Sequence, residues 1–312
     1  MILSVLDIGS NTTKVLVVRE CDRGKFAVVG EKSIPLRLAN FLFGNLPCLP
    51  DEAINETLET ISFLLEFSSE FNPQAIAIVG TETLRKVSNV KELSFRIKER
   101  FSLDLRVLSG EEEASGVVKG LLTDPSVHSF DQFCAIDLGG GSLEIVKVVD
   151  RRCESKCSLP LGAVVLAREF LGDLNNRPKK ESLMRLADNV HLKLMEKCSD
   201  FFDDRINLVG TGGALLYLRK IISSEKNMAF EDTQIMNFAD IQKVNDKLVS
   251  MTLKERKSSF PDLPSDRADI FPAALTVIVE FMKIFGKQII LHSFHNLRYG
   301  IASELLESHG KL

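Results

Sequence analysis

The sequence predicts an α/β protein that contains two copies of one domain. Strand-like runs of aliphatic residues alternate along the chain with segments of helical periodicity, which is typical of α/β folds. Two unlike motifs also repeat with one common spacing. Asp7 and Asp137 open matching glycine-containing turns, and Gly80 and Gly210 end matching strands; in each pair the second residue follows the first by 130 positions. Chance similarity can explain one repeated motif, but it does not explain two unlike motifs with the same offset.

Each predicted copy begins with a β-hairpin. Residues 2–12 form an apolar run that ends in a Gly/Ser turn, and residues 14–18 form the returning strand. Residues 133–142 and 143–149 repeat this pattern. Apolar, β-branched runs on both sides of a short glycine turn predict two paired antiparallel strands.

A second unit of structure follows in each copy. Residues 75–81 and 206–211 are apolar runs that end in Gly-Thr, and each leads into a helical segment that carries an arginine, Arg85 or Arg219. Further helices are predicted where apolar residues recur at steps of three and four. These are residues 51–67 (apolar face Ile54, Leu58, Ile61 and Leu65, starting after Pro50), 181–201, and 240–257 (apolar face Ile241, Val244, Leu248 and Met251).

The boundary between the two domains is predicted at residues 122–126, a short polar segment that contains a proline. The first domain therefore covers residues 1–124 and the second residues 125–299. We expect a C-terminal helix at about residues 300–312 to pack back on the first domain.

Composition excludes several classes of protein. The chain has 312 residues, of which 45% are hydrophobic and 26% are charged, as in ordinary globular proteins and unlike disordered chains or coiled coils. The formal net charge of −4 argues against a general nucleic-acid binder. Asp7 interrupts the N-terminal apolar run too early for a signal peptide, and residues 273–279 are too short for a membrane span. Six scattered cysteines favour reduced thiols in a cytoplasmic protein.

The two glycine turns are candidate phosphate-binding loops. Glycine lets the backbone approach a ligand closely, so that successive amides can point at one anion, and hydroxyl groups add further donors. A third turn opens a helix, where unpaired amides also favour an anion. The predicted phosphate-binding residues are Gly9, Ser10, Asn11, Thr12, Gly139, Gly140, Gly141, Ser142 and Gly212.

The aspartates that open the two turns suit a metal ion better than a phosphate, because like charges repel. Magnesium takes hard oxygen ligands and keeps several of its waters. Glu144 lies two residues beyond Ser142 on the same predicted strand, so its side chain points to the same face and can join Asp137. Asp7, Asp137 and Glu144 are therefore the predicted metal ligands.

The sequence Ser109–Ala114 contains three successive glutamates. Ser109 and Glu112 have the spacing of a helix capping box, and acidic residues in a first helical turn complement the helix dipole. These effects account for Glu111 and Glu112. Glu113 stands at the fourth helical position, where capping does not require it. Either it is a further surface charge, or its carboxylate orients a water molecule for attack on a terminal phosphate.

Together these residues resemble the exopolyphosphatase/guanosine pentaphosphate phosphohydrolase family of the actin, Hsp70 and sugar-kinase superfold. The resemblance covers nearly the whole chain. The segments that carry it are Asp7–Thr12, Gly80–Arg85, Ser109–Ala114, Asp137–Glu144, Leu159–Val164, Arg267–Ile270 and Leu297–Gly300.

The resemblance implies two ribonuclease H-like, actin-like domains with a cleft between them. It implies hydrolysis of a terminal phosphoanhydride, assisted by magnesium, with manganese as the alternative metal. Glu113 corresponds to the family's catalytic glutamate and Arg85 to its phosphate-contacting arginine, while Asp137 and Glu144 correspond to its metal-binding acids. Polyphosphate and guanosine pentaphosphate are the implied substrates and a homodimer the implied assembly, with no nucleic-acid or membrane partner.

The sequence departs from the family pattern in three places and lacks one extension. Leu143 replaces a threonine in the second loop, Tyr299 replaces a common glutamate, and residues 41–44 lack the usual glycine-rich turn. The chain also ends soon after residues 297–300, without the extra helical domains of longer family members, so we do not expect processive digestion of long polyphosphate.

Two other functions remain open at this stage. A kinase of the same superfold would need an acceptor pocket and a base in the second half, where no residue is as well placed as Glu113. A polyphosphate or nucleotide sensor, or an actin-like filament protein, would not need Glu113, Arg85 and both loop aspartates. The sequence does not separate polyphosphate from guanosine pentaphosphate.

Overall fold

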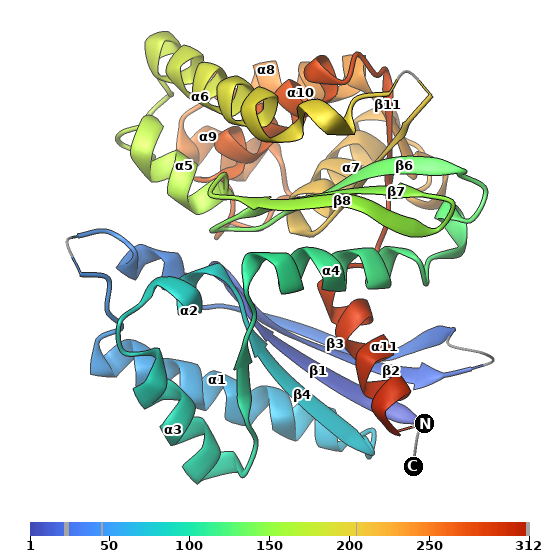
Figure 1. The fold of residues 1–312 in the computed structure, drawn as a ribbon. Coiled ribbons are helices and arrows are strands. Elements are labelled where there is room, and N and C mark those ends of the chain that lie inside the picture. Colours follow the sequence, from blue (N-terminus) through green and yellow to red (C-terminus); the bar gives the residue numbers. More distant parts are fainter. Residues whose placement is uncertain (22–24, 45, 204, 310–312) are drawn as a thin grey trace. The chain divides into compact units, whose positions relative to one another are not determined.

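The structure is a computed structural model with one mixed β-sheet in each of two compact units (Figure 1). It describes residues 1–21, 25–44, 46–203 and 205–309. Unit 1 consists of Met1–Pro125 with His295–Leu312, and unit 2 consists of Ser126–Phe294. Helices pack on both sheets, which confirms the predicted α/β fold class.

Unit 1 has a five-stranded sheet with the strand order β3-β2-β1-β4-β5. Its strands are β1 (Ile2–Ile8), β2 (Thr12–Glu20), β3 (Phe26–Pro35), β4 (Ala75–Gly80) and β5 (Leu105–Val107). β1, β2 and β3 are antiparallel neighbours, whereas β4 runs parallel to β1 and β5 runs parallel to β4. β1 and β2 are aliphatic and mostly buried on both faces, which suits the interior of a sheet that helices cover on two sides.

The helices of unit 1 form around this sheet. They are α1 (Asp51–Ser69), α2 (Glu82–Lys86), α3 (Val90–Phe101), α4 (Gly110–Leu121) and α11 (Leu297–His309), with a 3₁₀ turn at Leu38–Phe41. α1 starts directly after Pro50, as predicted, and buries Ile54, Leu58 and Ile61 against the sheet. The helical period of the sequence therefore identified the correct face of this helix.

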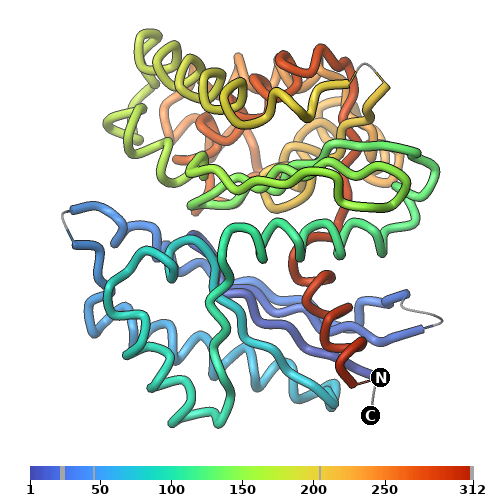
Figure 2. The backbone as a smooth tube through the Cα atoms, in the orientation of Figure 1, coloured from blue at the N-terminus to red at the C-terminus, as the bar shows by residue number. Residues whose placement is uncertain are grey.

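α11 lies along α4 inside unit 1, although it follows the last strand of unit 2 in the sequence (Figures 1 and 2). Glycines allow the two helix backbones to approach closely. A Cβ atom on Gly300 would lie 1.9 Å from the carbonyl oxygen of Gly116, and one on Gly120 would lie 2.0 Å from that of Asn296. The predicted C-terminal helix thus begins at Leu297; residues 310–312 lie outside the described residues.

Unit 2 has a six-stranded sheet with the strand order β10-β11-β9-β6-β7-β8. Its strands are β6 (Gln132–Leu138), β7 (Leu143–Val149), β8 (Arg152–Leu159), β9 (Asn207–Thr211), β10 (Ile235–Asn237) and β11 (Ile289–His292). β6, β7 and β8 form an antiparallel meander, and β9 runs parallel to β6.

The described part of unit 2 contains six α-helices. They are α5 (Ala163–Phe170), α6 (Lys180–Cys198), α7 (Gly213–Lys226), α8 (Phe238–Val249), α9 (Leu253–Ser259) and α10 (Phe271–Ile284), with 3₁₀ turns at Ser199–Phe201 and Glu231–Thr233. A further 3₁₀ turn, Pro125–Val127, lies where the chain passes from unit 1 to unit 2. Even α10, the most apolar of them, has only 14 residues. Among the described residues, no helix has both the length and the apolar character that crossing a membrane requires.

The prediction of one helix over residues 240–257 is wrong. α8 ends at Val249, and α9 starts after Thr252, whose side chain forms a capping box with Glu255. The apolar period continues through Met251, but a threonine and a glutamate at this spacing satisfy the first amides of a new helix. The capping box at Thr252 therefore starts a new helix, although the apolar periodicity continues across the break.

The predicted duplication is visible in the strand pairing. Across the first hairpin Asp7 pairs with Lys14, and across the second Asp137 pairs with Glu144, so both residues of the pair follow the 130-residue offset. The pairing of β2 with β3 and of β7 with β8 continues the repeat. The register shifts between residues 17 and 18 in unit 1 and between residues 147 and 148 in unit 2. The same irregularity at the same offset shows that the two hairpins are one structural motif.

The two copies differ in the parallel strand that follows. Gly80 pairs with Ile8 in unit 1, whereas Gly210 pairs with Ile136, two residues earlier in the equivalent strand. A shift of two residues keeps each side chain on its own face of the sheet. It moves the end of β9 so that Thr211 pairs with Asp137.

We predict that replacing Gly300 with alanine destabilises unit 1. The added Cβ would overlap the Gly116 carbonyl and force α11 away from α4, and overpacking of this kind costs about 1–3 kcal/mol. Urea unfolding followed by circular dichroism measures the change. Glu307→Ala, an exposed change on the same helix, is the control. Equal unfolding midpoints for the two variants would contradict the prediction.

Candidate active site

The first glycine loop, Gly9–Thr12, connects β1 to β2 in unit 1. The neighbouring segment holds its carbonyl oxygens: the Ala39 amide donates to Ser10 (2.8 Å) and the Arg37 amide to Asn11 (3.0 Å). The Ser10 hydroxyl also accepts a hydrogen bond from the Thr83 hydroxyl on α2 (2.9 Å). Carbonyl oxygens that would repel an anion are therefore already bonded within the protein.

Asp7 lies at the end of β1, directly before this loop. Its Oδ1 atom is buried and has no hydrogen-bond partner among the described residues. Burial raises the pKa of Asp7 above its ordinary value, while the positive charges of Lys14 and Arg298 act in the opposite direction. Since Lys14 pairs with Asp7 across the hairpin, a cationic side chain already faces this carboxylate.

Glu113 lies in the first turns of α4, next to a complete capping box. The Ser109 hydroxyl accepts from the Glu112 amide (3.2 Å), and the Glu112 carboxylate accepts from the Ser109 amide (2.8 Å). This reciprocal pair was predicted, and it lowers the pKa of Glu112 to about 2, mainly through the Ser109 amide. Glu113 takes no part in the cap, yet only 6% of its surface is exposed.

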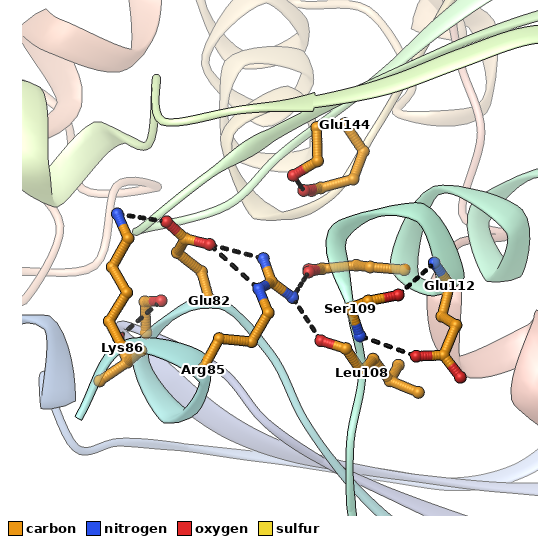
Figure 3. A network of polar contacts seen from close by, with 11 residues as sticks. Glu82, Arg85, Lys86, Leu108, Ser109, Glu112 and Glu144 are labelled. Atoms are coloured by element: carbon orange, nitrogen blue, oxygen red, sulfur yellow. Dashed lines mark hydrogen bonds and ion pairs between the residues drawn. The ribbon is translucent and has the colours of Figure 1, made fainter. Parts of the chain in front are cut away.

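Arg85 on α2 joins two buried carboxylates (Figure 3). Its Nη1 donates to Oε2 of Glu113 (2.6 Å) and to the Leu108 carbonyl (2.8 Å). Its Nη2 and Nε both donate to Oε2 of Glu82 (2.6 and 3.2 Å). Burial disfavours the charged guanidinium, but Glu113 and Glu82 outweigh burial and raise the pKa of Arg85.

The sequence placed Arg85 and Glu113 in separate motifs, and the structure brings them into direct contact. Glu82 was not predicted to belong to this group. Its Oε2 is bound by Arg85 and its Oε1 by Lys86 (2.5 Å), so both oxygens are paired with cations. Its position three residues before Arg85 on a helix was the available signal, because residues three apart on a helix face each other.

The second glycine loop, Gly139–Ser142, is held in unit 2 by the start of α5. The Ala163 amide donates to the Gly139 carbonyl (3.0 Å), and the Val164 amide donates to the Gly140 carbonyl (2.9 Å). Gly162 packs so closely that a Cβ on it would lie 2.2 Å from the backbone of the loop. This contact explains the glycine in the segment that follows β8.

Asp137 and Glu144 face each other across β6 and β7. The Ser158 hydroxyl on β8 donates to Oε1 of Glu144 (2.8 Å). Gly212, at the start of α7, has a φ of +88°, and a Cβ on it would lie 2.4 Å from Oδ1 of Asp137. Glycine is therefore required at this position both by the backbone conformation and by the approach to Asp137.

The pair of carboxylates fits a magnesium ion. Like charges placed directly opposite in a sheet repel, and a cation between them removes the repulsion. Magnesium is commonly held by one or two carboxylates together with waters and substrate phosphates. Among the described residues, no group of three or more His, Cys, Asp and Glu side chains is arranged around a metal position. The chain therefore offers this ion the two facing acids, Asp137 and Glu144.

Two departures from the family pattern lie away from these groups. Leu143 is fully buried, and its side chain points to the opposite face of β7 from Glu144. Tyr299 stacks on His295, with ring centroids 3.9 Å apart, inside unit 1. Burial raises the pKa of Tyr299 to about 12, so its hydroxyl stays neutral.

Comparison with known proteins agrees with the resemblance in the sequence. The Ppx/GppA phosphatase family profile matches residues 17–309. A relative named guanosine-5'-triphosphate,3'-diphosphate pyrophosphatase, from Vibrio atlanticus, is 25% identical over 305 residues, which are 97% of this chain. The chain spans only 59% of the length of that relative.

Two solved structures have the same fold. A Ppx/GppA family member from Aquifex aeolicus has a TM-score of 0.82 at 23% identity, and an exopolyphosphatase from Cytophaga hutchinsonii has a TM-score of 0.87 at 21% identity. Each comparison covers 99% of this chain and 98% of the other. The match to the family profile, which covers nearly all of the chain, shows that the protein belongs to the Ppx/GppA phosphatase family.

Proposed function

We propose that the protein hydrolyses the terminal phosphoanhydride of inorganic polyphosphate, guanosine pentaphosphate or both, and that Glu113 orients the attacking water. One observation carries this proposal. Glu113 is a buried carboxylate at the start of α4 that helix capping does not use, and it is bonded to Arg85. Buried charged groups that the fold does not need for its own capping are candidates for catalysis.

In the proposed reaction, Glu113 accepts a proton as the oxygen of a water molecule bonds to the terminal phosphorus. The bridging P–O bond breaks, and the shortened phosphate chain leaves. Arg85 donates to Oε2 of Glu113 and so fixes the orientation of the carboxylate that is proposed to hold the water. Glu113 raises the pKa of Arg85, and by the same interaction the charge of Arg85 favours the ionised form of Glu113, which is the form that can act as a base.

The proposed phosphate contact of Arg85 is limited by its present partners. Four of its five N–H groups donate to Glu82, Glu113 and Leu108. One N–H remains for a phosphate oxygen unless Glu82 is displaced. We therefore assign Arg85 first to orienting Glu113 and second to binding phosphate.

The glycine loops are the proposed phosphate-binding elements, and Asp137 and Glu144 are the proposed magnesium ligands. Bound magnesium would neutralise phosphate charge as the P–O bond breaks. Asp7 is the weaker candidate for the metal, because Lys14 pairs with it. The homodimer and the cytoplasmic location remain expectations of the sequence.

The experiment that tests this function measures phosphate release with magnesium from short polyphosphate, long polyphosphate and guanosine pentaphosphate. The relative rates identify the substrate. A superfold kinase would release no phosphate from these compounds and would require ATP and an acceptor. A sensor would bind one of them without turnover, and either result would reject the hydrolase.

We predict that Glu113→Gln lowers kcat about 10²-fold or more while substrate binding is kept. The amide preserves the shape of the side chain but cannot accept the proton from water. Glu111→Gln is the matched control, since Glu111 is an exposed glutamate in the same helical turn. A wild-type rate in Glu113→Gln would remove Glu113 from the mechanism.

We predict that Arg85→Met moves the acid limb of the pH–rate profile to higher pH. Arg85 stabilises the ionised form of Glu113, so its loss raises the pKa of that carboxylate and protonates the base at a higher pH. Profiles of kcat against pH for wild type and variant measure the shift. Lys86→Met, which removes a cation bonded to Glu82 and leaves Glu113 in place, should move the profile less. An acid limb that stays in place in Arg85→Met would contradict this assignment.

We predict that Asp137→Asn and Glu144→Gln each weaken magnesium binding about tenfold or more, which is about 1.4 kcal/mol. Each change removes one of two charges that the ion would neutralise. Titration with manganese, followed by electron paramagnetic resonance, measures binding directly. The control is Glu154→Gln, an exposed glutamate of the same sheet. Unchanged binding in both acid variants would place the metal elsewhere.

A further inference from the structure

Two of the six cysteines in the sequence lie side by side in unit 2. Cys157 belongs to β8, and Cys198 is the last residue of α6; their Sγ atoms are 3.7 Å apart. Both thiols are free in this structure. We propose that Cys157 and Cys198 are a peroxide-sensitive thiol pair that closes to a reversible disulfide, and that closure weakens the metal site at Glu144. The second half of this proposal rests on the proposed function.

The geometry favours a bond between these two residues. A disulfide has an S–S distance of about 2.05 Å, so the sulfur atoms must approach by less than 2 Å. Among the described strands, β8 is at the edge of its sheet and pairs with β7 alone, so one side of it is not held by a neighbouring strand. Residue 198 ends α6 and is followed by a short 3₁₀ turn, so neither partner lies in the middle of a rigid element.

The chemistry assigns different roles to the two thiols. The hydrogen bond from Cys198 lowers the pKa of Cys157, and the nearby charge of Lys197 acts in the same direction against burial. The same hydrogen bond and burial raise the pKa of Cys198. Cys157 is half-buried, whereas Cys198 is fully buried. Cys157 is therefore the thiolate that meets an oxidant first, and Cys198 is the resolving thiol.

The two steps balance with hydrogen peroxide as the oxidant. The Cys157 thiolate attacks one peroxide oxygen, the O–O bond breaks, and a sulfenic acid and hydroxide form. The sulfur of Cys198 then attacks the sulfenic sulfur and displaces its hydroxyl group, which leaves as water with the Cys198 proton. One peroxide is reduced, and two thiols are oxidised to one disulfide.

The pair is coupled to the metal site through one residue. Cys157 directly precedes Ser158, whose hydroxyl donates to Oε1 of Glu144 at 2.8 Å. Neighbouring side chains on a strand point to opposite faces, so Cys157 faces α6 while Ser158 faces Glu144. Drawing residue 157 toward α6 moves Ser158 away from Glu144. Loss of a hydrogen-bond partner of a metal ligand typically costs 10- to 100-fold in metal affinity.

Other pairings are less favourable. Cys134 is fully buried in β6, and burial raises its pKa well above the ordinary value. Cys153 is exposed on β8, but its pKa is raised and its thiol is bonded to the Ser155 carbonyl. Among the four cysteines of unit 2, Cys157 and Cys198 are therefore the favoured pair, and mapping of cross-linked peptides tests this assignment.

The first test uses the full chain, reduced, freed of reductant and exposed to hydrogen peroxide. After an acid quench and alkylation with iodoacetamide, peptic peptides are analysed by mass spectrometry. We expect a cross-linked peptide that joins Cys157 to Cys198 and that disappears with dithiothreitol. Cys153→Ser should give the same cross-link. In Cys198→Ser, a dimedone probe should trap a sulfenic acid on Cys157. Full alkylation of Cys157 and Cys198 after peroxide, or a cross-link to Cys134, would overturn the assignment of the pair.

The second test measures manganese binding to the reduced and the oxidised wild type. We expect the oxidised protein to bind about tenfold more weakly, dithiothreitol to restore binding, and peroxide to leave the affinity of Cys198→Ser unchanged. A mapped disulfide with unchanged manganese affinity would overturn the coupling to Glu144. If the reduced protein itself binds no manganese, the proposed metal site fails and the coupling fails with it, while the disulfide is judged by its mapping alone.

Discussion

The constraint on which the functional residues depend is the cost of burying a carboxylate. Removing a charge from water is unfavourable unless a cation or several hydrogen bonds compensate. In unit 1, Glu113 and Glu82 share Arg85, and Asp7 pairs with Lys14. In unit 2, the residue opposite Asp137 is another acid, Glu144. The same strand position therefore carries a lysine opposite the aspartate in one copy and a second acid in the other, where the proposed magnesium ion would bind.

The two copies of the hairpin thus differ in charge next to their aspartates. Residues 14 and 144 occupy equivalent positions, so a lysine lies opposite Asp7 and a glutamate lies opposite Asp137. The arginines on the helices that follow β4 and β9 also have different partners. Arg219 is buried and donates to the Phe230 carbonyl, so it stabilises unit 2, whereas Arg85 bonds to acids.

The sequence predicted those features that local spacing determines. The 130-residue offset identified both hairpins, and the capping box of Ser109 and Glu112 identified the start of α4. Long-range features were not predictable. Ser158 bonds to Glu144 because β8 folds back on β7, and the spacing of the two residues in the sequence does not predict this contact. The break between α8 and α9 was missed because the apolar period runs through it, although the cap at Thr252 was present in the sequence.

The return of α11 to unit 1 has a consequence for synthesis. Unit 2 is continuous in the sequence, so all of its residues are synthesised before those of α11. Unit 1, by contrast, is formed from one segment that precedes unit 2 in the sequence and one that follows it. α4, which carries Glu113, obtains its close partner only when Gly300 arrives to meet Gly116. The helix that bears the proposed base therefore stays without this partner in a nascent chain until α11 has been made and has emerged.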